Sequence, residues 1–193
     1  FSAVPDPVAA PLLSDPSAPD GNATGTSDAI AVDQIFDLAE ELTPGIETYG
    51  FIYNLGEVNS VSVISDAKAY LDEQDIAYVE STVTNSGEVS QSAQALLDQG
   101  ADAIFVPIDN TVASAMTNLS DIATQAQVPV YVAADSMVKD GALATVGVNY
   151  TNLGKQTAAM AVKVLEGTPV SEIPVEVLDE YSVVVNEETA AAL

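Results

Sequence analysis

A regular alternation of short apolar strands and amphipathic helices is the feature that most constrains the fold of this chain. Apolar runs typical of strands occur at residues 48–53, 77–82, 103–106, 128–132 and 145–148. Apolar residues recur with helical periodicity between these runs, at residues 58–73, 89–99 and 111–125, and after the last run, at residues 152–165. Strand–helix–strand units of this kind join parallel strands by right-handed crossovers. The sequence therefore predicts an α/β fold, in which helices cover both faces of a parallel sheet.

The two ends of the chain follow a different pattern. Residues 1–28 hold five of the ten prolines, and proline lacks the N–H donor that a central strand or a helix needs. We therefore expect one short strand at residues 1–4, followed by a long loop. Ser27 or Asp28 is expected to cap a helix that ends near residue 43. Two short strands are expected near the C-terminal end, at residues 175–177 and 181–185.

Composition excludes several classes of function. The chain has no Cys, His, Arg or Trp, and its 29 acidic residues face only four lysines, which gives a formal net charge of −25. Zinc fingers, disulfide frameworks and Cys–His nucleophiles are thereby excluded. A nucleic-acid partner is not expected, because binding to phosphates depends on Lys and Arg. No nucleotide cofactor is expected either, since the glycine and Gly-Lys motifs of nucleotide-binding loops are missing. No dedicated metal site and no other cofactor are expected.

The loops that follow the strands are the candidate sites, because parallel sheets bind ligands at the carboxyl ends of their strands. Asn59 and Ser60 follow the strand at 48–53 and start a helix. They either cap that helix or help its backbone N–H groups hold an anion. Asp109 and Asn110 follow the strand at 103–106, where they either cap the next helix or contact a ligand. We expect Asp109 to face the crevice.

Two further aspartates end strands in the same way. Asp135 follows the strand at 128–132, and Asp6 follows the strand expected at the start of the chain. Paired carboxylates can act as a catalytic acid and base, or can bind a metal together with Asn or Glu57. Separated strand-end carboxylates more often accept hydrogen bonds. Without a nucleophile or a His base, the sequence favours the acceptor role and predicts no enzymatic activity.

Several sequence blocks carry a family resemblance. The blocks FSAVPDPVAAPLL, YNLGEVNS, PIDNTV and LGKQTAAMAVKVLEG, in this order, are similar to the substrate-binding lipoproteins of ABC importers. The resemblance extends over almost the whole chain, and it is to the group that takes up aromatic amino acids such as tryptophan or tyrosine. It implies the type I periplasmic-binding architecture, in which two βαβ lobes close on a ligand.

The resemblance also implies a domain organisation. Residues 46–148 would form the C-terminal lobe, to which residues 174–193 return, whereas residues 1–45 and 149–173 would belong to a partial N-terminal lobe. Members of the family carry a further segment upstream, with the start of that lobe and a lipid-anchored Cys. The chain is therefore expected to be an N-terminally truncated fragment of an extracytoplasmic lipoprotein. Its expected partners are a small-molecule ligand, an ABC permease and, for the fragment, a second copy of itself.

The family's cleft loops fall on the residues that the strand ends indicate, namely Asp6, Asn59, Ser60, Asp109, Asn110 and Asp135. An aromatic amino acid needs an acceptor for its ammonium group, which Asp109 or Asp135 would supply. Because the chain has no Arg, donors for the ligand carboxylate would be side chains such as Ser60 or backbone N–H groups. Two alternatives remain open at this point: an effector-binding domain of a regulator, and an α/β enzyme that uses the strand-end Asp residues.

Overall fold

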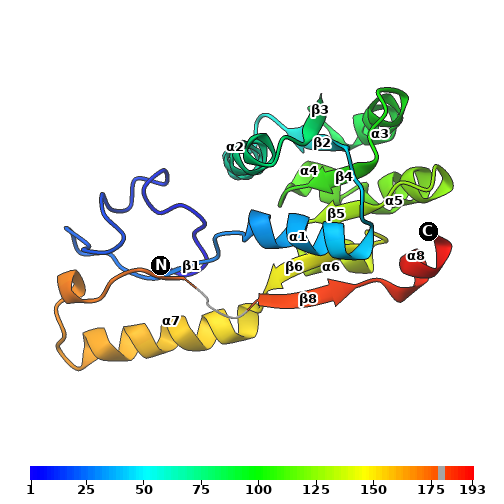
Figure 1. The fold of residues 1–193 in the computed structure, drawn as a ribbon. Coiled ribbons are helices and arrows are strands. Elements are labelled where there is room, and N and C mark those ends of the chain that lie inside the picture. Colours follow the sequence, from blue (N-terminus) through cyan, green and yellow to red (C-terminus); the bar gives the residue numbers. More distant parts are fainter. Residues whose placement is uncertain (178–180) are drawn as a thin grey trace. The chain divides into compact units, whose positions relative to one another are not determined.

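The computed structural model describes residues 1–177 and 181–193, and the chain forms two compact units (Figure 1). The first unit comprises Phe1–Ile30 and Val148–Ser182, and the second comprises Ala31–Gly147 and Val183–Leu193. The first boundary lies 15 residues before the expected one, at residue 30 instead of 45. The difference arises because the helix after residue 31 packs its apolar face within the second unit.

A six-stranded sheet is the centre of the second unit. Its order is β3-β2-β4-β5-β6-β8. The strands are β2 (Thr48–Asn54), β3 (Ala77–Val83), β4 (Ala103–Val106), β5 (Val130–Val132), β6 (Ala144–Val148) and β8 (Tyr181–Val185). Strands β2 to β6 pair in parallel, with Phe51 opposite Phe105 and Phe105 opposite Tyr131. The predicted parallel α/β fold is thereby confirmed.

Helices cover both faces of this sheet (Figure 1). Helices α1 (Val32–Leu42) and α2 (Val58–Glu73) lie together on one face. Helices α3 (Val89–Asp98) and α5 (Met116–Gln125) pack together on the other. Four short helices complete the unit: η1 (Ser86–Glu88), α4 (Asn110–Ala113), α6 (Asp135–Lys139) and α8 (Glu187–Ala192).

The alternation of side chains along β2 builds two cores. On one face, the ring of Phe36 from α1 contacts two rings of the sheet. The centroid of Phe36 lies 4.7 Å from that of Tyr49 and 5.2 Å from that of Phe105. On the opposite face, Gly50 leaves room for α3, because a Cβ atom at Gly50 would lie 3.2 Å from the Leu96 side chain. Successive side chains of a strand point to opposite faces, so the two layers of helices are packed independently.

The first unit contains a two-stranded parallel pair and one long helix. Strand β1 (Thr26–Ser27) pairs with β7 (Glu176–Val177). Helix α7 (Tyr150–Leu165) contacts β1, where the hydroxyl groups of Thr157 and Thr26 lie 2.7 Å apart. A short turn of 3-10 helix, η2, covers Val170–Glu172.

Three expectations about secondary structure are wrong. Residues 1–4 form no strand, because Ala3 has a positive φ of 53° that interrupts the extended backbone. Helix α1 begins at Val32 without a side-chain cap, so neither Ser27 nor Asp28 caps it. The helix expected at 111–125 is divided into α4 and α5 by a turn at residues 114–115. In the described part of the chain, no helix has the length and apolar character needed to cross a membrane.

Candidate functional site

Four of the six predicted residues, Asn59, Ser60, Asp109 and Asn110, lie at the carboxyl edge of the sheet of the second unit, where β2 and β4 end. The loop after β2 and the first turn of α2 contribute residues 54–60, and the loop after β4 with the start of α4 contributes residues 108–112. We call these two segments the carboxyl-edge cluster. Hydrogen bonds join them at several points, so the cluster is one connected polar network.

Asp109 pins the two segments of the cluster together. Its side chain is only 1% exposed. Oδ2 accepts a hydrogen bond of 2.7 Å from the backbone N–H of Asn54, and Oδ1 accepts one of 2.9 Å from the N–H of Val112, which caps α4. Asp109 is therefore a helix cap and a link between strands. The expectation that it faces the crevice is wrong, because both of its oxygens are directed at backbone donors inside the unit.

Glu57 makes the second link. Its Oε2 accepts hydrogen bonds from the backbone and side-chain amides of Asn110, at 2.9 and 3.0 Å. Its Oε1 accepts bonds from the backbone N–H and the hydroxyl of Thr111, both at 3.0 Å. Partial burial raises the pKa of Glu57, but these four bonds outweigh it and hold the pKa below its ordinary value of 4.5. The carboxylate is thus ionised at neutral pH and fully occupied by donors.

Asn59 and Ser60 hold the other side of the β4 loop. The Asn59 side-chain amide and the Ser60 hydroxyl both donate to the carbonyl oxygen of Ile108, at 2.7 and 3.1 Å. Ser60 is fully buried, whereas Asn59 is exposed. The interpretation of either residue as the cap of α2 is wrong, because Glu57 occupies the cap position and makes no side-chain cap bond. Both side chains thereby position the neighbouring loop.

The other two predicted residues lie outside this network. Asp135 is the first residue of α6, just beyond the end of β5, and its Oδ2 lies 3.2 Å from the Lys139 ammonium group. Asp6 belongs to the first unit, where its exposed carboxylate accepts bonds of 2.9 Å from the N–H groups of Val8 and Ala9. The structure thus brings together Asn59, Ser60, Asp109 and Asn110.

The chemistry of the cluster is that of hydrogen bonding. Within residues 1–177 and 181–193, no group of three or more acidic side chains comes together in a way that could hold a metal ion. The two carboxylates of the cluster, Asp109 and Glu57, have backbone N–H donors on both of their oxygens. Their role in the described structure is therefore to fix two loops at one sheet edge.

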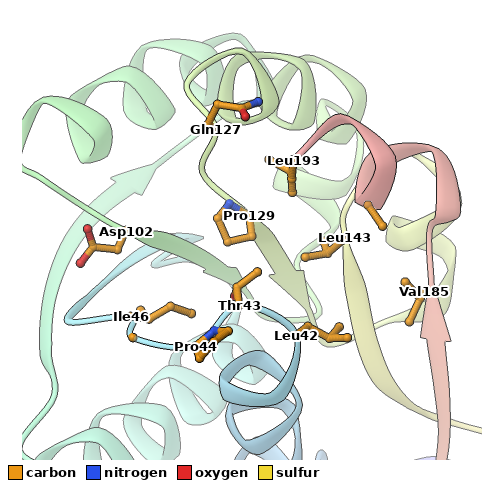
Figure 2. A pocket seen from close by; sticks show the side chains of 12 residues that line it. Leu42, Thr43, Pro44, Ile46, Asp102, Gln127, Pro129, Leu143, Val185 and Leu193 are labelled. Carbon is orange, nitrogen blue, oxygen red and sulfur yellow. The ribbon is translucent and has the colours of Figure 1, made fainter.

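Two hollows in the second unit lie away from the predicted residues. A cavity of about 430 Å³ opens at the opposite edge of the sheet, and its lining includes Ile46, Asp102, Pro129 and Leu143, which precede β2, β4, β5 and β6 (Figure 2). Another, of about 620 Å³, is lined by polar side chains of α5, α6 and α8. None of the six predicted residues lines either hollow.

Comparison with known proteins assigns the family. The family model described as ABC transporter substrate binding protein matches residues 1–193. The chain belongs to this family. It is 37% identical over 193 residues to a tyrosine-binding protein of Clostridioides difficile, and the match covers 100% of this chain and 56% of that protein.

Solved structures of substrate-binding proteins have the same fold. A ligand-free, open substrate-binding protein with adhesive properties from Clostridium difficile is 41% identical, with a TM-score of 0.88 over 98% of this chain and 64% of that one. An ABC domain from Streptococcus pneumonia in complex with L-Trp is 33% identical, with a TM-score of 0.84 over 98% and 64%. The chain thus spans less than two thirds of the length of these relatives.

Family membership gives the general character of these proteins. These proteins bind substrates for ABC transporters outside the cytoplasm and are not enzymes. The catalytic alternative for Asp6, Asp109 and Asp135 is therefore excluded for this ABC transporter substrate-binding protein. The type I periplasmic-binding fold that the resemblance implied is confirmed by the solved relatives.

Sequence reasoning missed the residues that organise the carboxyl-edge cluster. Glu57 was considered only as an added metal ligand, yet it makes four of the bonds in the network. Asn54 was not singled out, although its side-chain amide donates to the Thr111 hydroxyl at 2.9 Å and its side-chain Oδ1 accepts from the N–H of Gly56. The available signal was a polar residue directly after a buried strand, followed three residues later by an acid before a helix.

Proposed function

We propose that this protein is the solute-binding component of an ABC importer and that its ligand is an aromatic amino acid. The observation that carries the proposal is the relative that was solved with L-Trp, which is 33% identical and matches 98% of this chain. The tyrosine-binding relative, at 37% identity over all 193 residues, supports the same ligand class. Both ligands combine an aromatic ring with an ammonium and a carboxylate group.

The carboxyl-edge cluster would supply one wall of the binding site. Asn59 and Asn110 are exposed there, and the hydrogen bonds of Asp109 and Glu57 hold the loops that carry them. A preorganised wall loses little entropy when a ligand binds. Because no Arg is present, amide and backbone N–H groups are the donors that this wall offers to a ligand carboxylate.

The remaining parts of the proposal concern the whole protein. The relatives are longer than this chain, which covers 56% of the tyrosine-binding protein. We propose that the first unit is part of an N-terminal lobe completed by an upstream segment, and that the full-length form is membrane-anchored and passes its ligand to a permease. Dimerisation of the 193-residue chain is a further proposal, which sedimentation would test.

Calorimetric titration of the full-length protein with the twenty amino acids tests the ligand class. We expect heat of binding with tyrosine or tryptophan, no heat with alanine as a small control, and no conversion of the bound compound. Heat with none of the aromatic amino acids, or turnover of one, would refute the proposal. The 193-residue chain alone should bind weakly or not at all, because much of the pocket would lie in the upstream segment.

A further inference from the structure

Asp28 is a buried carboxylate that the carboxyl-edge cluster does not use. It directly follows β1 in the first unit and is only 6% exposed. Its Oδ2 accepts a hydrogen bond of 3.1 Å from the hydroxyl of Tyr150, whereas its Oδ1 is buried without any hydrogen-bond partner. The carboxylate therefore has a single donor, supplied by a side chain.

No other buried carboxylate oxygen of the described residues is left in this state. Asp109 is equally buried, but both of its oxygens accept backbone N–H groups. Glu57 has four donors. A buried charge that lacks partners disfavours the folded state unless a cation or further donors compensate it. Asp28 thus has one oxygen, Oδ1, that could still accept a hydrogen bond from a positively charged donor.

The neighbourhood of Asp28 suits an ammonium group. Two phenols reach this segment, since Tyr150 donates to Asp28 and Tyr181 donates to the carbonyl of Ala29 at 3.3 Å. A carboxylate accepts charge-assisted hydrogen bonds from an ammonium group, and phenol oxygens can accept further ones. The Tyr150 side chain is half-exposed, so a rotation of this side chain would open the carboxylate to a ligand. The same hydroxyl would shield it when no ligand is bound.

We propose that Asp28 accepts the ammonium group of the amino-acid ligand. This role rests on the proposed function, and it replaces Asp109, whose oxygens are already occupied, as the ammonium acceptor. Asp28 is also placed as strand-end ligand contacts are in parallel folds, immediately after a strand.

The test compares tyrosine with desaminotyrosine, which lacks only the ammonium group, in the full-length protein and its Asp28→Asn variant. We expect the variant to lose about 10- to 100-fold in tyrosine affinity and less than about threefold in desaminotyrosine affinity. Without ligand, the variant should melt at the same or a higher temperature than the wild type, because it no longer buries an uncompensated charge. A residue with a purely structural role would give the opposite change in stability.

Two further variants complete the design. Glu172→Gln makes the same carboxylate-to-amide change at an exposed position of the first unit and should alter neither affinity. Tyr150→Phe removes the phenol donor but keeps the carboxylate, so it should retain the discrimination between the two ligands even if Asp28→Asn fails to fold. If Asp28→Asn loses the same affinity for both ligands, or if Tyr150→Phe no longer discriminates between them, the role of Asp28 is overturned while the proposed function stands. A wild-type protein that binds no amino acid overturns the proposed function and this role together.

Discussion

Replacement of Asp109 by alanine should strongly destabilise the second unit even when no ligand is present. The change removes the acceptor of two backbone N–H groups, those of Asn54 and Val112, at a position that is 1% exposed. Hydrogen bonds to a charged group contribute about 1.5–3 kcal/mol each. Some water would enter the space that alanine leaves, so we expect a total loss of about 3–5 kcal/mol in the free energy of unfolding.

Replacement of Asp109 by asparagine should cost about half as much. The amide oxygen can still accept the N–H of Val112, but the amide nitrogen then faces the N–H of Asn54, donor against donor. One bond is lost and the other becomes neutral, which gives about 2 kcal/mol. If Asp109 instead faced the crevice and accepted the ligand ammonium group, asparagine would leave the ligand-free stability unchanged. The ligand-free stability of the Asp109→Asn variant therefore distinguishes the two roles of Asp109.

Urea unfolding of the 193-residue chain measures these losses. Tyrosine fluorescence reports mainly on the second unit, which holds five of the seven tyrosines, and far-ultraviolet circular dichroism provides an independent probe. With a slope of about 2 kcal/mol per molar urea, Asp109→Ala should lower the midpoint by roughly 1.5–2.5 M. Asp121→Ala, at an exposed position of α5, controls for the loss of one negative charge. A difference below about 1 kcal/mol between these two alanine variants would refute the reasoning.

Two other variants test the loops of the second unit. Glu57→Gln should cost about 1 kcal/mol at pH 7. Because hydrogen bonds lower the pKa of Glu57 below its ordinary value of 4.5 in the folded state, this deficit should persist as the pH falls to about 4.5 and should shrink as the pH falls further, through the lowered pKa. A deficit that is constant over this range in urea melts would contradict that origin. Gly141→Ala should cost about 2–4 kcal/mol, because φ is +117° and the new Cβ would lie 2.9 Å from Cβ of Ser120. Its control, Gly154→Ala in open space on α7, should have no cost in the same urea melts.

The helices and strands of the second unit could be predicted because apolar residues recur in a regular pattern along them. The boundaries of α2 and β4 agree with the sequence-based ranges 58–73 and 103–106, since both elements bury apolar side chains at regular intervals. The start of α1 could not be predicted. Ser27 and Asp28 are good helix caps by residue type, but their side chains are engaged elsewhere, by the carbonyl of Pro5 and the hydroxyl of Tyr150.

The site could be located from the sequence, but the roles of its residues could not be assigned. Strand ends mark the carboxyl edge, and four of the six predicted residues meet there. Their functions within it depend on partners more than 50 residues away, as in the bonds from Asn54 to Asp109 and from Asn110 to Glu57. The same contacts anchor the start of α4, which is separated from α5 by a turn at residues 114–115.

The acidic composition explains how this edge is built and why Asp28 differs from it. With 29 acidic residues, four lysines and no arginine, the chain cannot neutralise its buried carboxylates with cations. The ion pairs of the described residues engage three lysines, at Glu80, Asp135 and Glu176. Asp109 and Glu57 are instead satisfied largely by backbone N–H groups, which cannot leave without unfolding the loops. Asp28 depends on one side-chain hydroxyl, so among these buried acids it is the one that can exchange its donor for a ligand while the backbone stays in place.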